Sequence, residues 1–270
     1  MANQALQGKI VMLTGGGSGI GRRIAQQLSS TGATLIICGR NVTSLEETVA
    51  SFTETDAPHL AYAMDVRNPV QVERVVTTVV SRFGGIDVLI NNAGVASHSM
   101  LEDCTDEQWN EIITTNLGGV FHCCRAVVPL MRRQGNGTII MVSSILAKHG
   151  VAGLGPYCAS KFGVLGLGQS LAAELASTAI KVYIVCPGAT LTPLHISLVG
   201  SDVASLSMDP SEVASVICGL AEGNMNIPSG SEIVIDKQRN SVTPHGLSHV
   251  RMKIGRLINR VFQLRSRSFD

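Results

Sequence analysis

The sequence has few aromatic residues and almost no net charge. Of its 270 residues, one is Trp, three are Tyr and six are Phe, and the formal net charge at pH 7 is +1. Nucleic-acid-binding domains usually carry a basic surface, and those that bind single strands add aromatic side chains on which bases stack. We therefore expect no nucleic-acid partner.

The sequence also lacks the cysteine spacings of metal sites. Its seven cysteines include no CxxC pair and no Cys/His pattern typical of zinc. Most lie inside apolar segments, which favours reduced core residues in a reducing compartment. These are Cys38, Cys123, Cys124, Cys158, Cys186 and Cys218. We expect no metal site and a cytoplasmic location.

Long hydrophobic runs are missing as well. Residues 1–8 lack the basic start and long apolar run of a signal peptide, and no stretch is long enough to span a bilayer. A chain of this length with 45% hydrophobic residues buries a large core and fits one α/β domain.

Apolar runs typical of buried strands alternate with helical patterns along the chain. The expected strands are 9–14, 34–38, 59–64, 88–90, 138–142, 181–186 and 232–236. Helical patterns separate them, and the longest is expected over 106–133. Strands buried on both faces and spaced by helices predict a single-domain, Rossmann-like, doubly wound parallel sheet of about seven strands, within residues 1–243.

A glycine-rich loop follows the first strand and opens a helix. It reads Gly15-Gly16-Gly17-Ser18-Gly19-Ile20-Gly21. Glycines in this position let the backbone approach a pyrophosphate, which the free N–H groups of the helix N-terminus stabilise. Such a turn alone is a weak signal, but between a strand and a helix it predicts a dinucleotide site.

The second expected strand ends in Cys38-Gly39-Arg40. Proteins that bind the non-phosphorylated cofactor usually place an Asp or Glu here for the ribose 2′-hydroxyl, whereas an Arg accommodates a 2′-phosphate. Because the acid is missing and Arg40 is present, we predict NADP(H) as cofactor, with NADPH preferred over NADH. The alternative is that Arg40 is an ordinary exposed loop residue.

Tyr157 and Lys161 are four residues apart, so on a helix they share one face. A nearby ammonium favours phenolate, and we expect it to lower the Tyr157 pKa enough for proton exchange with a substrate oxygen near neutral pH. Ser144 follows the expected strand 138–142, and its hydroxyl could hold the same oxygen. Either residue pattern alone is common by chance.

Taken together, these motifs resemble the short-chain dehydrogenase/reductase family from about Gly8 to Thr192. The matching residues are Thr14, Gly15, Gly19 and Gly21, then Asn91-Asn92-Ala93-Gly94, Asn116, Ser144, Tyr157, Lys161, Pro187-Gly188 and Thr192. The resemblance implies an oxidoreductase that transfers a hydride between a nicotinamide and a carbonyl or secondary alcohol carbon. It also implies a homo-oligomer, a dimer or tetramer, built on the helices that carry Trp109 and Tyr157.

The resemblance assigns roles residue by residue. Tyr157 becomes the acid/base, Lys161 its activator and a ribose ligand, and Ser144 the group that orients the carbonyl. Asn116 holds a proton-relay water and kinks its helix. The cofactor residues it implies are Gly15, Gly17, Ser18, Gly19, Ile20, Gly21, Arg40, Asp65, Val66, Asn92, Ala93, Gly94, Tyr157, Lys161, Pro187, Gly188 and Thr192, with Asn91 also expected along the channel. Asp65 and Val66 meet the adenine.

Two departures from the family pattern concern the substrate. The last strand ends in Asp236-Lys237 rather than Asp-Gly-Gly, and the substrate-covering region, 193–208, is short. Residues expected near the carbonyl are apolar, which favours an apolar or lipid-like substrate. They are Val95, Ala96, Ile145, Leu146, Leu154 and Leu194. Two alternatives to a carbonyl reductase stay open: an enzyme that oxidises a secondary alcohol, and a cofactor-binding scaffold without turnover.

The stretch 244–270 departs from the rest in charge. Apolar positions Val250, Ile254, Leu257, Val261 and Leu264 recur at helical spacing, and they stand among six basic residues. They predict a basic amphipathic C-terminal helix. Two interpretations stay open: it lies on an anionic membrane surface as a peripheral contact, or it packs on the acidic body or a neighbouring subunit.

Overall fold

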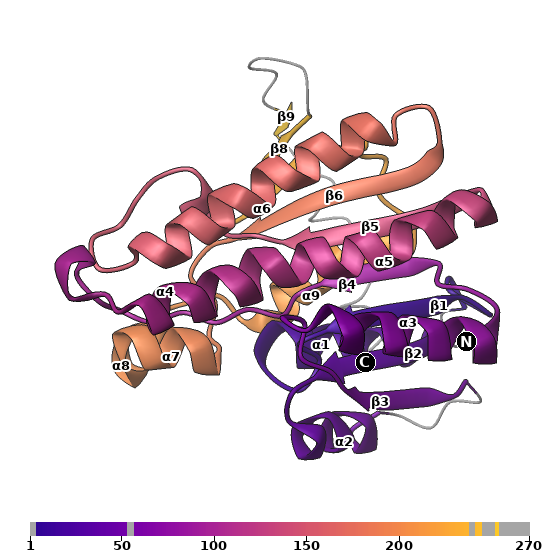
Figure 1. Cartoon of the computed structure of the whole chain (residues 1–270), viewed down its shortest axis with the longest axis horizontal. Coiled ribbons are helices and arrows are strands. Elements are labelled where there is room, and N and C mark those ends of the chain that lie inside the picture. Colours follow the sequence, from indigo (N-terminus) through magenta and orange to yellow (C-terminus); the bar gives the residue numbers. More distant parts are fainter. Residues whose placement is uncertain (1–3, 53–56, 238–240, 245–251, 254–270) are drawn as a thin grey trace, which may run out of the picture.

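The chain folds around a central sheet with helices on both faces (Figure 1). The structure, a computed structural model, describes residues 4–52, 57–237, 241–244 and 252–253. In this part of the chain the strand order is β3-β2-β1-β4-β5-β6-β7-β8-β9. Strands β1 to β7 pair in parallel, as the sequence predicts for a doubly wound, Rossmann-like sheet.

The parallel strands match the apolar runs to within two residues at each end. They are β1 (Ile10–Thr14), β2 (Thr34–Gly39), β3 (His59–Ala63), β4 (Val88–Asn91), β5 (Asn136–Val142), β6 (Ala179–Pro187) and β7 (Glu232–Ile235). Burial on both faces makes most of these strands continuously apolar, which is why their limits are readable from the sequence. The edge strand β3 is only half-buried.

Two short antiparallel strands extend the sheet beyond the seven that were expected. Strand β8 (Ser241–Thr243) pairs with β7, and β9 (Met252–Lys253) pairs with β8. Pairing with β8 satisfies the backbone groups on the outer edge of β7. Met252 and Lys253 fall within the predicted C-terminal helix, and at these two residues the prediction is wrong. The apolar positions that suggested this helix lie outside the described residues.

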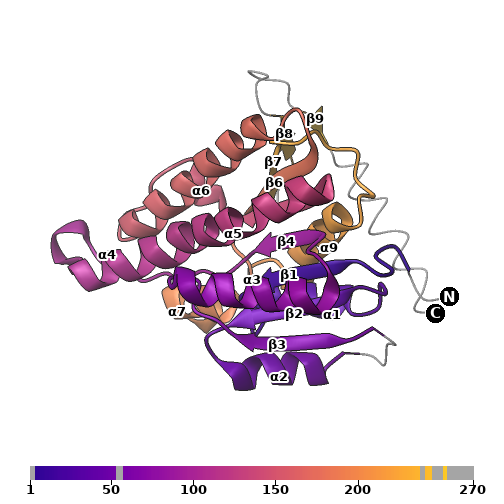
Figure 2. The same cartoon turned by 45° about the vertical axis from the view of Figure 1, so that its right-hand side comes forward.

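The helices form two layers. Helices α3, α5 and α6 run side by side over one face of the sheet, while α1, α2 and α9 pack on the other (Figure 2). The bounds are α1 (Gly19–Leu28), α2 (Val42–Ala50), α3 (Pro69–Phe83), α4 (Asp106–Ile113), α5 (Gly119–Gln134), α6 (Gly155–Glu174), α7 (Pro193–Val199), α8 (Ser201–Ala204) and α9 (Pro210–Ala221). Short turns η1 (Leu101–Asp103) and η3 (Ile145–Ala147) are 3₁₀-helical.

Local chemistry sets the ends of these helices. The Asn68 side chain accepts hydrogen bonds from the first N–H groups of α3, and Gly84 ends that helix with φ 87°. Thr105 and Asp209 each form a capping box, at α4 and α9. The helix expected over 106–133 is interrupted by a π turn, η2 (Thr114–Gly118), between α4 and α5.

Because the parallel strands run the same way, their carboxyl ends meet at one end of the sheet, and the loops there carry α4, α7 and α8 (Figure 1). The candidate site lies at this end.

Candidate active site

A cavity of about 610 Å³ opens at the carboxyl ends of the parallel strands. The lining gathers most of the residues that the sequence marks as catalytic or cofactor-binding. These are Gly15, Ser18, Gly19, Ile20, Gly21, Asn92, Ala93, Gly94, Ser144, Tyr157, Lys161, Pro187, Gly188 and Thr192. Segments far apart in the chain thus converge on one hollow.

The glycine loop is packed too tightly for side chains. A Cβ on Gly15 would lie 2.9 Å from the Ala93 Cα, and Gly15 has φ +70°. A Cβ on Gly21 would lie 2.0 Å from the Gly15 carbonyl oxygen. The loop therefore holds the first turn of α1 against the cavity. That turn contains no acidic residue, and the Ser18 side chain makes no capping bond, so its N–H groups are available to an anion.

The residues after β4 fasten this loop to the sheet. The Asn92 side-chain amide donates to the Thr14 and Gly15 carbonyl oxygens, each at 3.1 Å. The Thr14 hydroxyl accepts from the Asn92 and Ala93 backbone N–H groups. Asn91 differs from its expected place along the cofactor channel: it is buried, and its amide points to the Cys124 sulfur at 3.5 Å. The alternation of side chains along β4 turns Asn91 toward α5.

Asn116 lies in the π turn and is 1% exposed. Its Oδ1 accepts from the Val95 N–H at 2.8 Å, and its Nδ2 donates to the Val95 carbonyl at 2.9 Å and to Ser160 Oγ at 3.0 Å. The side chain thus bridges the loop after β4 to α6 behind the cavity wall, and is not itself in the lining. π turns inside helices are frequent at functional sites. The turn corresponds to the predicted kink.

Lys161 is buried beneath the cavity. Its Nζ donates to the Val142 carbonyl oxygen at 2.9 Å and lies 5.5 Å from the centre of the Tyr157 ring. A Cβ on Gly94 would lie 3.6 Å from this Nζ and 3.3 Å from Asn116 Oδ1, so Gly94 sits between them. Ser144 begins the η3 turn, and its hydroxyl oxygen accepts from the Leu146 N–H at 3.1 Å.

Burial acts on the two titratable groups of this cluster in opposite directions. It raises the pKa of Tyr157 to about 12, although a hydrogen bond with Ser144 opposes the shift. It lowers the pKa of Lys161 to about 8. The Tyr157 pKa therefore shifts in the direction opposite to the one that the spacing predicts, because desolvation of the phenolate is the largest effect on it.

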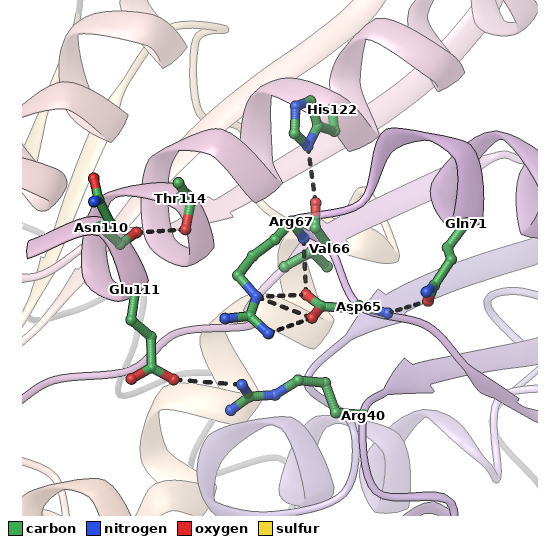
Figure 3. A network of polar contacts seen from close by, with 9 residues as sticks. All are labelled: Arg40, Asp65, Val66, Arg67, Gln71, Asn110, Glu111, Thr114 and His122. Atoms are coloured by element: carbon green, nitrogen blue, oxygen red, sulfur yellow. Dashed lines mark hydrogen bonds and ion pairs between the residues drawn. The ribbon is translucent and has the colours of Figure 1, made fainter. Parts of the chain in front are cut away.

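Arg40 and Asp65 are not in the cavity lining. Both belong to the network of polar contacts in Figure 3. Arg40 Nη1 forms an ion pair with Glu111 Oε1 of α4 at 3.4 Å, and both side chains are about half exposed. Arg67 clasps Asp65, with its Nη2 2.6 Å from Oδ2, and holds the pKa of Asp65 below its ordinary value. Two arginines therefore flank the end of β2 and β3, where the sequence pointed to Arg40 alone.

Gly17 and Val66 also lie outside the lining. A Cβ on Gly17 would lie 3.0 Å from that of Ser44, so this glycine allows α2 to approach the loop. The Val66 side chain is buried against Gly119 of α5, and its carbonyl accepts from His122 Nδ1 at 2.9 Å. The Val66 side chain is therefore not placed to contact a ligand.

The remaining lining is mainly apolar. Ile145, Leu146, Leu154 and Leu194 line the cavity as expected, whereas Val95 and Ala96 do not. Sequence reasoning missed His98, Leu198 and Val199, which lie in the wall without belonging to any motif. It also missed the ion pair between Lys148 Nζ and Glu232 Oε1 at 2.6 Å, which fastens the loop after η3 to β7.

All seven cysteines are free, and the six in apolar segments are buried, as expected. Among the residues that the structure describes, no three His, Cys, Asp or Glu side chains come together as metal ligands. In the same part of the chain, no helix is long and apolar enough to cross a bilayer.

Comparison with known proteins identifies the class to which this fold and site belong. Residues 9–201 match the family model described as short chain dehydrogenase. The chain belongs to the short-chain dehydrogenase/reductase family, and it is an oxidoreductase acting on CH–OH or C=O groups.

Individual relatives extend the match over most of the chain. Over 239 residues it is 36% identical to "3-oxoacyl-[acyl-carrier-protein] reductase FabG" of Thermotoga maritima, which covers 86% of this chain and 97% of the relative. The Escherichia coli protein of the same description is 37% identical over 182 residues, 67% of this chain and 73% of the relative. The crystal structure of levodione reductase superposes with a TM-score of 0.81 at 30% identity, covering 86% and 97% of the two chains.

Membership of the family implies a nicotinamide dinucleotide, NAD(P)(H), and a small carbonyl substrate. The site fits such a cofactor on its own features. The loop has room for backbone only at Gly15 and Gly21, and the uncapped N-terminus of α1 faces the cavity.

Proposed function

We propose that the protein is an NADPH-dependent reductase of an apolar carbonyl compound. The observation that carries the proposal is the convergence of Ser144, Tyr157 and Lys161 on the cavity that also contains the glycine loop. When bound, the cofactor would supply the hydride for the carbonyl carbon. The glycine loop, Asn92 to Gly94 and Thr192 would hold it.

The side chains of the cluster would handle the charge on the substrate oxygen. The Ser144 and Tyr157 hydroxyls would donate hydrogen bonds to that oxygen as negative charge develops. Tyr157 would then give its proton to the oxygen, and the Lys161 ammonium beside its ring would stabilise the phenolate. Asn116 would position this group by linking the loop after β4 to the α6 residue Ser160.

A substrate panel tests the proposal. Purified full-length protein is mixed with NADPH and, in turn, with apolar ketones, sterols and 3-oxoacyl thioesters, and the loss of NADPH absorbance is followed. We expect turnover of at least one apolar class. Binding of NADPH without turnover across the panel would instead favour a cofactor-binding scaffold.

The preference for NADPH rests on Arg40, with Arg67 beside it. Replacing Arg40 by Ala is expected to weaken NADPH binding by about 1.5–3 kcal/mol, because a charge-assisted bond to the 2′-phosphate is lost, and to leave NADH binding almost unchanged. Isothermal titration with both cofactors measures this. Arg74→Ala, on the exposed face of α3, is the matched control. Equal affinity of the unaltered protein for NADPH and NADH would contradict the proposal.

We also propose a homo-oligomer, a dimer or tetramer. The exposed faces of α4, α5 and α6 carry Trp109, Phe121 and Phe162, each more than 40% exposed. Large apolar side chains gathered on neighbouring helices are typical of a surface that a second copy covers.

The tail beyond residue 243 gives a separate prediction. If its basic apolar stripe contacts membranes, the full-length protein will sediment with anionic vesicles at low salt, and a variant ending at Thr243 will not. The alternative, in which the tail serves assembly, predicts that neither form sediments and that the shortened form changes its oligomeric state. Vesicles of neutral lipid are the control.

A further inference from the structure

The segments around the mouth of the cavity contain very few basic residues. No Lys or Arg occurs between Arg82 and Arg125 or between Lys181 and Lys237, and Lys148 is the single one between Arg133 and Lys161. These segments include η1, α7 and α8, and the loop after β5, which line or border the cavity.

Within the part of the chain that the structure describes, each lysine that lies nearby has a hydrogen-bond or ion-pair partner. Lys148 Nζ is 2.6 Å from the carboxylate of Glu232, which is 7% exposed. A carboxylate buried to this extent holds its counter-ion strongly, because leaving it unpaired is costly. Lys237 Nζ donates to the Leu206 carbonyl oxygen at 2.8 Å, and Lys161 is buried against Val142.

Exposed carboxylates lie on elements that adjoin the cavity. Glu102 and Asp103 are exposed on η1. This turn lies against the cavity wall, because Leu101 reaches Gly155 and the Ser99 N–H donates to the Gly153 carbonyl at 2.9 Å. On the other side, Asp202 is exposed on α8, directly after the lining helix α7.

Several exposed side chains in and beside the lining elements are apolar. Leu101 is 78% exposed, Leu206 74% and Val203 56%. Val151 and Val199, which also line the cavity, are each about 40% exposed. Exposed apolar side chains around an apolar cavity fit a hydrophobic ligand that projects from it.

The expected cofactor end of the molecule differs from the mouth because two arginines, Arg40 and Arg67, lie there (Figure 3). Phosphates are normally recognised by Arg or Lys side chains. Among the described residues near the mouth, Lys148 is neutralised by Glu232 and Lys161 is buried, so Lys237 is the one exposed cation set against the carboxylates of Glu102, Asp103 and Asp202. We expect this excess of negative charge to repel an anion. The arm that joins an acyl group to coenzyme A, or to a carrier protein, carries a phosphate.

We propose that the substrate is an uncharged apolar carbonyl compound that enters free from solution, and that thioesters on a phosphate-bearing arm are selected against. The inference rests on the proposed function and narrows its substrate class. It separates this chain from relatives whose names specify an acyl-carrier-protein substrate.

The test compares two thioesters that carry the same 3-oxoacyl group and differ in the thiol to which it is attached. The full-length protein is assayed with the neutral N-acetylcysteamine thioester and with the coenzyme A thioester, at pH 8, where histidine is ordinarily neutral. At low salt we expect kcat/KM to favour the neutral thioester by ~10-fold or more, and this ratio to fall at least ~3-fold in 0.5 M NaCl as the repulsion is screened.

Charge reversal at the rim gives a second measurement. Glu102→Lys and Asp202→Lys should each raise kcat/KM for the coenzyme A thioester by about 3-fold or more at low salt, and leave the neutral thioester unchanged. Glu73→Lys, exposed on α3 away from the mouth, is the control and should change neither.

Equal or faster use of the coenzyme A thioester at low salt, or a rate for it that falls as salt rises, would overturn this inference while leaving the proposed reductase intact. Absence of turnover with both thioesters and with free apolar ketones, in protein that still binds NADPH, would count against the proposed function and this inference together.

Discussion

Replacing Tyr157 by Phe is expected to lower turnover at least ~10²-fold while changing NADPH affinity little. The substitution keeps the ring that packs over Lys161 and removes only the hydroxyl that would donate the proton. Turnover is measured with the best substrate of the panel, and NADPH affinity by fluorescence titration.

Tyr183→Phe is the matched control. Its hydroxyl is buried and donates to the Ile227 carbonyl at 3.3 Å, away from the cavity lining. Removing it costs a hydrogen bond of about 1 kcal/mol and should leave turnover unchanged. Equal turnover of Tyr157→Phe and the unaltered protein would remove Tyr157 from the mechanism.

Replacing Lys161 by Met is expected to abolish most turnover and yet to stabilise the cofactor-free fold. Burial lowers the Lys161 pKa from its ordinary 10.5 to about 8, so at pH 7 the fold carries the cost of a desolvated ammonium. That cost is up to about 3 kcal/mol. Loss of the bond to the Val142 carbonyl offsets about 1 kcal/mol. A net gain of about 2 kcal/mol remains.

The sign of the pH dependence follows from the same shift. Between about pH 8 and 10.5 the unfolded chain binds the Lys161 proton and the folded chain has released it, so the contribution of Lys161 to the free energy of unfolding rises with pH across this window. The buried thiols of Cys38, Cys123, Cys124 and Cys186, whose pKa values burial raises, act in the opposite direction above about pH 9, so the Lys161 contribution is taken from the difference between the variant and the unaltered protein. Lys161→Met should lose that rise. Denaturant unfolding at pH 7 and 10 measures both effects, with exposed Lys181→Met as control. A variant less stable than the unaltered protein at pH 7 would contradict this account.

Much of the fold could be read from the sequence because most of its parallel strands are buried on both faces. The continuous apolar run Thr138–Val142 and its counterparts give both the position and the parallel class of each strand. Strands β8 and β9 could not be read in this way, because Ser241–Thr243 is too short for a periodic signal and gains its stability by pairing with β7. The kink at Asn116 was expected from the family resemblance alone, because one extra residue in a helical turn gives no distinctive local pattern.

At the site, the sequence predicted where the side chains lie better than it predicted their pKa values. Spacing placed Tyr157 and Lys161 on one face of α6, and the structure has them there. The direction of the Tyr157 pKa shift was predicted wrongly, since sequence does not show how deeply a group is buried. The pairs Arg40–Glu111 and Lys148–Glu232 join residues distant in the chain, and nothing local in either partner signals the other.

Deuterium labelling tests the central claim most directly. The claim is that the protein transfers a hydride from NADPH to a carbonyl carbon within this cavity. The full-length protein is incubated with NADPH carrying deuterium at the reactive carbon of the nicotinamide and with an apolar ketone, using each of the two stereospecifically labelled forms in turn. Mass spectrometry of the alcohol should show one deuterium on the carbinol carbon with one label and none with the other. Alcohol formed without deuterium from either label, or no alcohol from any ketone, would contradict the account.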